Sequence, residues 1–197
     1  LSSAGASTVA MASPAMAAQQ ANEGAQRMFN TAENLRNSGQ LDEARQGYER
    51  LIAQHGESSL VGRALIELIF IDREFDDPAS ARRRAEELIT KFNGTANEAA
   101  GRVLIAEVDL DFASTLNDVT AAKRALVEVL QNFVRTLYPT LEWRARARVR
   151  LGDANFLLGV FDEAAGDYVS AIEDEPDSAL TRVAELGLAK VLLWQNE

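Results

Sequence analysis

The sequence predicts an all-α protein in which helical hairpins stack as an α-solenoid. Its 197 residues are rich in alanine and include 4 prolines and 7% aromatic residues. This composition favours helices, because alanine loses no side-chain entropy in a helix whereas β-sheets depend on aromatic and β-branched residues. Apolar residues recur with helical spacing from residue 22 onward. Similar segments also return at offsets of 37, 41 and 42 residues, a period typical of solenoids whose unit is one helical hairpin.

The repeat is clearest in the second helix of each hairpin. Leu41, Ala44, Tyr48, Leu51 and Ile52 form one apolar stripe on a helix. The last four residues return three times, as Ala81, Ala85, Leu88 and Ile89, as Ala122, Leu126, Val129 and Leu130, and as Ala164, Tyr168, Ala171 and Ile172. The first helix repeats independently, because GRALIE at 62–67 is matched by GRVLIA at 101–106, with Ala25-Gln26 and Ala145-Arg146 in the corresponding places. The first and second helices of the hairpins therefore repeat in the same register along the chain.

The repeats place the helices in order along the chain. Helix pairs are expected at 22–38 and 41–55, 58–74 and 78–92, 95–114 and 118–134, and 139–158 and 161–174, followed by a single helix from about 178. Local signals support several of these boundaries. Asp118 and Asp177 are expected to accept amide hydrogen bonds at helix starts, and Pro139 suits a first turn. Helix ends are expected near Gly39, Gly56 and Gly159.

The first 21 residues differ from the rest in carrying no charge. They contain Ala15-Met16-Ala17, and small residues at this spacing fit the cleavage region of a secretory signal peptide. The alternative is a flexible Ala/Ser segment. We therefore expect a signal-peptide remnant or flexible segment at 1–21 and a helical repeat domain at 22–197. Export to the periplasm or cell envelope is predicted, with a cytoplasmic location as the alternative.

Composition excludes several classes of function. The chain has no cysteine and one histidine, which excludes disulfides, thiolate chemistry and cysteine–zinc sites and makes His55 necessary for any histidine-based site. The formal net charge of −10 argues against general nucleic-acid binding, because phosphate neutralisation needs a surplus of lysine and arginine. No stretch has the length and apolarity of a transmembrane helix.

No catalytic constellation is visible in the sequence. His55 falls at a predicted helix end, where it can interact with terminal carbonyl groups. Asp109 and Asp111 form a DxD pair, but residues two apart on a helix point in different directions, which disfavours a shared metal. Neither a Gly-rich phosphate loop nor an HExxH motif is present. The sequence therefore predicts no catalytic residue, no metal site and no cofactor.

The repeats resemble those of the tetratricopeptide repeat (TPR) family. The fourth unit carries the fullest match, in the usual order and spacing of the family: Leu151-Gly152, Gly159, Phe161, Ala164, Tyr168, Ala171 and Pro176. The first unit shares Gly39, Leu41, Ala44 and Tyr48, with Gly56 where the family commonly has proline. The middle units depart from the pattern at Asp76, at Asp77-Pro78 and in a longer turn at 114–118. The resemblance covers residues 22–197, and it implies a right-handed superhelix of about four hairpins plus a terminal helix.

Arginine side chains suggest where a partner binds. Arg82-Arg83-Arg84 and the alternating arginines at 144–150 spread around their helices. By contrast, Arg63, Arg102 and Arg146 share one place in three successive hairpins, on the face that lines the concave groove in TPR proteins. Such a column could hold a carboxylate-bearing peptide. The alternative is that these arginines form ion pairs with acids of adjacent helices. Apolar contacts beside the column are expected from Phe29, Ile66, Phe70, Ile105 and Phe156.

The resemblance implies a non-catalytic TPR scaffold that binds a protein or peptide partner in its concave groove. The spacing also resembles bacterial cell-envelope TPR proteins, which suggests that compartment. A structural subunit packed permanently in a larger or self-associated complex is the alternative, and an enzyme is the least favoured interpretation. Residues 178–195 form an apolar helix with two stripes, of which only one can pack on the fourth hairpin. We therefore expect further repeats or self-association at this helix.

Overall fold

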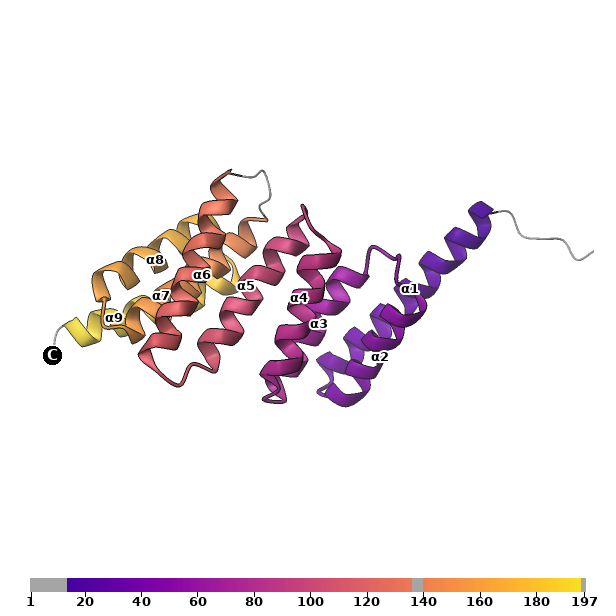
Figure 1. The fold of residues 1–197 in the computed structure, drawn as a ribbon, viewed down its shortest axis with the longest axis horizontal. Helices are drawn as coiled ribbons and strands as arrows, with labels where there is room; N and C mark the ends of the chain where they lie inside the picture. Colours follow the sequence, from indigo (N-terminus) through magenta and orange to yellow (C-terminus); the bar gives the residue numbers. More distant parts are fainter. Residues whose placement is uncertain (1–13, 136–139, 196–197) are drawn as a thin grey trace, which may run out of the picture. The chain divides into compact units, whose positions relative to one another are not determined.

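The computed structural model describes residues 14–135 and 140–195. Within these ranges every regular element is an α-helix (Figure 1). The helices are α1 (Pro14–Asn37), α2 (Leu41–Gln54), α3 (Val61–Glu74), α4 (Pro78–Lys91), α5 (Ala96–Asp111), α6 (Leu116–Arg135), α7 (Leu141–Leu157), α8 (Phe161–Asp174) and α9 (Ala179–Gln195). The all-α class and the order of paired helices followed by a terminal helix are confirmed for the described residues.

The first helix starts earlier than the repeat pattern predicts. Helix α1 begins at Pro14 instead of residue 22, so residues 14–21, expected to be a signal-peptide remnant or flexible segment, are helical. Proline suits a first helical turn, and alanine, methionine and glutamine are good helix formers. Residues 1–13, which carry the rest of that prediction, lie outside the described residues.

The predicted cap of α6 is confirmed, and the predicted cap of α9 lies one residue later. Asp118 accepts from the Ser114 and Thr115 amides at the start of α6, at 3.1 and 2.9 Å. The Thr115 hydroxyl in turn accepts from the Asp118 amide at 3.2 Å, which completes a capping box. Ser178, not Asp177, caps α9 and accepts from the Thr181 amide at 3.2 Å. Pro139 lies outside the described residues. Gly39 and Gly159 follow α1 and α7 at positive φ, as expected for helix ends.

The chain divides into two compact units, residues 1–64 and 65–197, with the boundary inside α3. In the first unit α1 and α2 form a hairpin whose helices approach closely at Gly47. A Cβ atom at this position would lie only 2.9 Å from the Ala32 Cβ. The Phe29 and Tyr48 rings meet edge to face with centroids 5.4 Å apart, and both side chains are buried.

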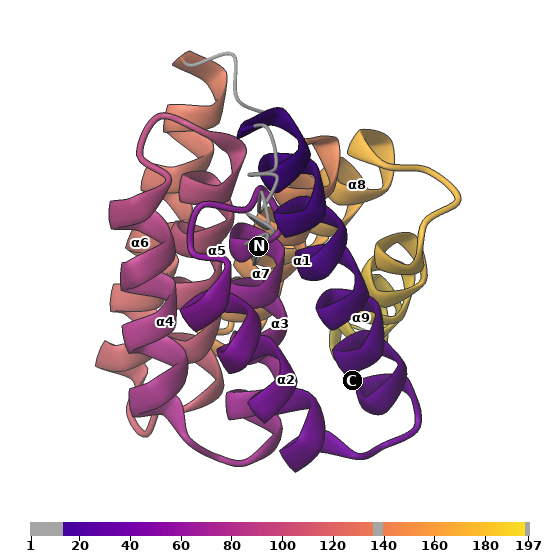
Figure 2. The same ribbon diagram turned by 90° about the vertical axis from the view of Figure 1, so that its right-hand side faces the viewer.

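In the second unit α7, α8 and α9 pack on each other, with α8 and α9 side by side in Figure 2. The Tyr168 ring is buried between them. A Cβ on Gly152 would lie 2.7 Å from this ring, and a Cβ on Gly187 of α9 would overlap it from the other helix. Gly152 therefore lies at a close contact between helices. The Tyr168 hydroxyl donates to Asp153 Oδ1 at 2.8 Å, and burial together with the Asp153 charge raises the pKa of this tyrosine.

Helix α9 divides into the two stripes that the sequence predicts. Ala184 and Val191 are buried, with Leu180 and Leu188 half-buried beside them. On the other stripe Leu186, Leu193 and Trp194 are 59%, 69% and 59% exposed. Among the helices of the described ranges, none is both long and apolar enough to cross a membrane.

Candidate functional site

Helix α5 presents two different polar faces in the second unit. It packs against α4, α6 and α7 and lies between α4 and α6 (Figure 1). Glu107 and Asp111 form what we term the inner face. Ile105 and Asp109, each two positions from an inner residue, belong to what we term the outer face, together with Glu98, Arg102 and Phe112. Residues two apart on an α-helix lie about 160° apart around its axis, so these faces look in opposite directions.

The inner face holds a buried ion-pair network. The Glu107 side chain is completely buried and accepts from Arg73 at 2.7 Å and from Arg146 at 2.5 and 2.8 Å. Asp111 accepts from Arg73 and Arg150. Because an unpaired carboxylate is costly inside a protein, two guanidinium groups on one buried glutamate are a structural requirement of this packing.

The network extends to the last hairpin. Arg150 donates to Asp153 at 2.9 Å, and Asp153 is the acceptor of the Tyr168 hydroxyl. Burial lowers the pKa of Arg150, but the carboxylates of Asp111, Glu107 and Asp153 outweigh burial and leave that pKa raised. Residues of α3, α5, α7 and α8 are thus connected by charge-assisted hydrogen bonds.

Each arginine of the predicted column has a carboxylate partner within the chain. Arg63 lies 3.6 Å from Glu33 and covers the Phe29 ring, with 4.4 Å to the centroid. Arg102 lies 2.8 Å from Glu98, and Arg146 is held by Glu107. Arg63 and Arg146 thus pair with acids of other helices, as the alternative interpretation expects, whereas Arg102 pairs with an acid of its own helix.

The structure separates Arg102 from Arg146 although the repeat register equates them. Arg102 belongs to the outer face of α5, whereas Arg146 of α7 binds the inner face. The apolar residues divide in the same way. Phe70 lies under Arg146, 4.9 Å from ring centroid to guanidinium carbon, and Ile105 lies on the outer face. Three other predicted groove residues lie elsewhere: Phe29 is buried in the first unit, Ile66 is half-buried in α3, and Phe156 packs on Phe161 and Trp194.

The remaining arginine clusters spread around their helices as predicted. Arg82 pairs with Asp109, Arg83 donates to the Ser80 hydroxyl, and Arg84 pairs with Asp72 at 2.6 Å. In α7, Arg144 and Arg148 both bind Asp174, at 2.5 and 2.6 Å. The DxD pair also divides, because Asp109 meets Arg82 and Asp111 meets Arg73 and Arg150.

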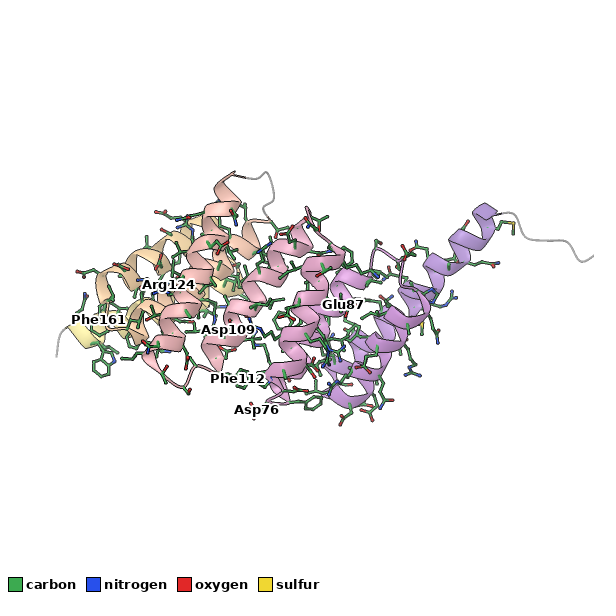
Figure 3. The ribbon with its side chains drawn as sticks, viewed as in Figure 1. Asp76, Glu87, Asp109, Phe112, Arg124 and Phe161 are labelled. Carbon is green, nitrogen blue, oxygen red and sulfur yellow. The ribbon has the colours of Figure 1, made fainter. Side chains whose placement is uncertain are left out.

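Two pockets lie along the outer face of α5 between α4 and α6, and we term the surface that includes both of them the outer groove. A large pocket of about 500 Å³ lies at the N-terminal ends of α4 and α6; its lining residues are Pro78, Ala79, Arg82, Val108, Asp109, Phe112, Ala113, Asp118 and Ala121. A small pocket of about 130 Å³ lies farther along the same helices and is lined by Ile89, Arg102, Ile105, Ala125, Glu128, Val129 and Asn132. Figure 3 shows Asp109 and Phe112 of the large pocket.

The cations of the outer groove are already paired. Arg82 contacts both Asp109 and Glu86, the latter at 3.3 Å, and Arg102 is paired with Glu98. Asp118 instead caps α6, where hydrogen bonds from Thr115 and Ser114 hold the pKa of its carboxyl below the usual value. Phe112 is 39% exposed beside these charges. Arg82, Asp109 and Phe112 were not predicted as a group, although the spacing 98, 102, 105, 109, 112 places Asp109 and Phe112 on one helix face.

Comparisons with known proteins identify the repeat type. Residues 28–58, from the middle of α1 to the turn after α2, match the family model of the tetratricopeptide repeat. No curated protein sequence matches the chain significantly. The crystal structure of TTC0263, a thermophilic TPR protein in Thermus thermophilus, is similar, with 17% identity, coverage of 86% of this chain and 99% of that chain, and a TM-score of 0.48. The chain contains a tetratricopeptide repeat, as its first unit predicted.

Proposed function

We propose that this tetratricopeptide-repeat chain is a non-catalytic scaffold that binds a segment of a protein partner in the outer groove of its second unit. Tetratricopeptide repeats typically mediate protein interactions, and stacked helical repeats provide extended binding surfaces. The observation that carries the proposal is the pair of pockets along one face of α5. The opposite face of the same helix is fixed by the buried network, so the groove is preformed and the entropy of ordering falls mainly on the ligand.

This site differs from the concave groove expected from the sequence. Of the predicted groove residues, Arg102 and Ile105 line a pocket of the outer groove. Arg146 instead donates to Glu107 from two of its nitrogens. Removing Arg146 from that carboxylate would leave Glu107 with Arg73 alone, which makes Arg146 a poor group for holding a ligand carboxylate. We therefore place the binding surface at Arg102 and Ile105 and assign Arg146 to the framework.

Affinity capture with matched variants tests the proposal. The immobilised chain is incubated with extract of its source cells, and bound proteins are identified by mass spectrometry. Replacement of Phe112 by Asp should abolish capture of the main partner, because it places a charge in the apolar part of the large pocket. Val169→Asp is the control, since Val169 is an exposed apolar residue of α8, 42% accessible. Equal capture by wild type and Phe112→Asp, with both variants fully helical by circular dichroism, would reject the outer groove.

Export to the cell envelope is a further proposal that the uncharged sequence before residue 22 supports. Fractionation of the source cells, followed by immunoblotting for this chain, tests it. Recovery in the periplasmic or envelope fraction is expected, whereas recovery with cytoplasmic markers alone would refute it.

The exposed stripe of α9 favours a second candidate function, as a structural subunit that pairs with another copy. Leu186, Leu193 and Trp194 are all more than half exposed on one helix, and monomers rarely leave such apolar stripes uncovered. Light scattering coupled to size-exclusion chromatography should then show a dimer for the wild type and a monomer for Leu186→Glu/Leu193→Glu. A wild-type monomer at high concentration would exclude self-association through this stripe.

A further inference from the structure

The large pocket of the outer groove combines apolar walls with the carboxylate of Asp118, which forms no ion pair with any residue that the structure describes. Its volume of about 500 Å³ falls within the range of about 300–1,000 Å³ that is usual for ligand sites. Pro78, Val108, Phe112 and Ala121 contribute apolar surface from the region of three helices. These walls suit insertion of one large apolar side chain.

The cation of this pocket is unsuited to binding an acidic ligand. The Arg82 guanidinium already contacts two carboxylates, those of Asp109 and Glu86. A ligand carboxylate would have to displace one of them and would approach Asp109 and Asp118 with like charge. Electrostatics therefore disfavour at this pocket the carboxylate-bearing peptide that the arginine column suggests.

Asp118 is suited to binding a cation. All three hydrogen bonds that its carboxylate accepts, from the Ser114 amide and hydroxyl and the Thr115 amide, go to Oδ2, at 3.1, 3.1 and 2.9 Å. An ionised carboxylate has two acceptor oxygens, so these three hydrogen bonds leave Oδ1 of Asp118, a residue that lines the pocket, available as an acceptor. Among the described residues no lysine or arginine forms an ion pair with Asp118. The partly exposed Phe112 ring offers a second favourable contact for a cation.

We propose that the large pocket binds a partner segment that inserts one large apolar side chain against Val108 and Phe112 and places a lysine or arginine beside Asp118. This inference rests on the proposed function and adds the chemistry of the partner segment. The net charge of −10 acts in the same direction, because it accelerates the approach of a basic partner at low ionic strength.

Three short fluorescein-labelled peptides serve as probes. Each has a flexible Gly/Ser frame, and the centres are Trp-Arg-Arg, Trp-Glu-Glu and Ala-Arg-Arg. Fluorescence anisotropy titrations use the full 197-residue chain. The Trp-Arg-Arg peptide should bind best, and the other two should bind at least about tenfold more weakly, because each lacks one of the two complementary features. Binding of Trp-Arg-Arg should weaken as salt is raised.

Variants of the chain locate the binding. Ala121→Trp fills the pocket while preserving every charge, and it should abolish binding of the Trp-Arg-Arg peptide. Asp118→Asn keeps a side-chain oxygen for the α6 cap and should weaken binding by about two- to fivefold, the range of an exposed ion pair. Leu193→Glu changes the exposed stripe of α9 and should leave binding unaltered. Circular dichroism verifies that each variant is helical.

The outcomes separate this inference from the proposed function. Equal or tighter binding of Trp-Glu-Glu, or unchanged binding by Ala121→Trp, would overturn the inference. If Phe112→Asp still abolishes capture of the natural partner in that case, the outer groove remains the binding surface and only the assigned chemistry is wrong. If Phe112→Asp also leaves capture intact, the proposed function fails with it.

Discussion

The two faces of α5 carry the same kinds of side chain in different surroundings. On the inner face Glu107 is completely buried and binds two arginines. On the outer face Arg102 and Glu98 form an ion pair with side chains 44% and 19% exposed. Both faces pair arginine with a carboxylate, yet only the inner carboxylate is completely buried and lacks water as an alternative partner. Burial of the carboxylate, more than the presence of an ion pair, makes an arginine structural.

Buried and exposed ion pairs differ in how much the loss of one partner lowers the free energy of unfolding. Removing one partner of a buried pair typically destabilises a protein by about 3–5 kcal/mol, because an uncompensated charge is left in the interior. Exposed pairs contribute about 0–1 kcal/mol. The outer face can therefore change in sequence or engage a ligand with little effect on folding, whereas the inner face cannot.

The largest expected effect follows substitution of the inner glutamate. Glu107→Gln keeps the shape of the side chain but removes the charge that Arg73 and Arg146 share, so it should lower the free energy of unfolding by about 3–5 kcal/mol. Urea denaturation monitored by circular dichroism measures the change. Glu98→Gln on the same helix is the matched control and should lose at most about 1 kcal/mol, because it keeps a side-chain oxygen for the Gly94 amide and removes only a partly exposed charge near the helix start. Similar losses in the two variants would remove the distinction between the faces.

A smaller effect on stability is expected where α7 packs on the Tyr168 ring, whose hydroxyl is hydrogen-bonded to Asp153 of the network. Gly152→Leu forces a side chain into the Tyr168 ring, 2.7 Å from the Cβ position, and overpacking of this kind costs about 1–3 kcal/mol. Gly166→Ala in α8 is the control, because a Cβ there meets nothing within 4 Å; it should raise stability by about 0.5–1 kcal/mol through helix propensity. A Gly152→Leu variant with an unchanged melting temperature would contradict the packing around Tyr168.

The smallest effect concerns pH and the cap beside the large pocket. Hydrogen bonds depress the pKa of Asp118 below its usual 3.8, so its carboxylate contributes stability above that pH, and the contribution is lost as pH falls through the folded-state pKa. Wild type should be more stable than Asp118→Asn at pH 7, and the difference should shrink as pH falls below 3.8. Thermal melts across this range measure it. A difference independent of pH would show that ionisation of Asp118 does not contribute.

The fold was largely predictable because helical periodicity and the repeat act over many residues. Helices α2, α4 and α8 begin at the predicted residues 41, 78 and 161. The cap of α9 was less predictable, since Asp177 and Ser178 both have suitable side chains and only the backbone geometry selects Ser178. Gly152 and Tyr168 both belong to the family spacing of the fourth unit, but spacing alone did not predict that they contact each other.

The candidate site was less predictable because it depends on which helices enclose a residue. The repeat register places Arg102 and Arg146 at equivalent positions, but their carboxylate partners are not equivalent. Arg102 pairs with Glu98 of its own helix, whereas Arg146 of α7 pairs with Glu107 of α5. A repeat register compares positions within hairpins and carries no information on such neighbours. Arg82 and Asp109 are likewise 27 residues apart in the chain.

Double-mutant cycles on the two equivalent arginines test the central claim most directly. One cycle combines Arg146→Met with Glu107→Gln, and the other combines Arg102→Met with Glu98→Gln, with unfolding free energies measured for every member. We expect a coupling energy of about 1–3 kcal/mol for the inner pair and at most about 0.5 kcal/mol for the outer pair. Equal coupling energies, or a larger value for the outer pair, would contradict the division of α5 into a structural face and a binding face.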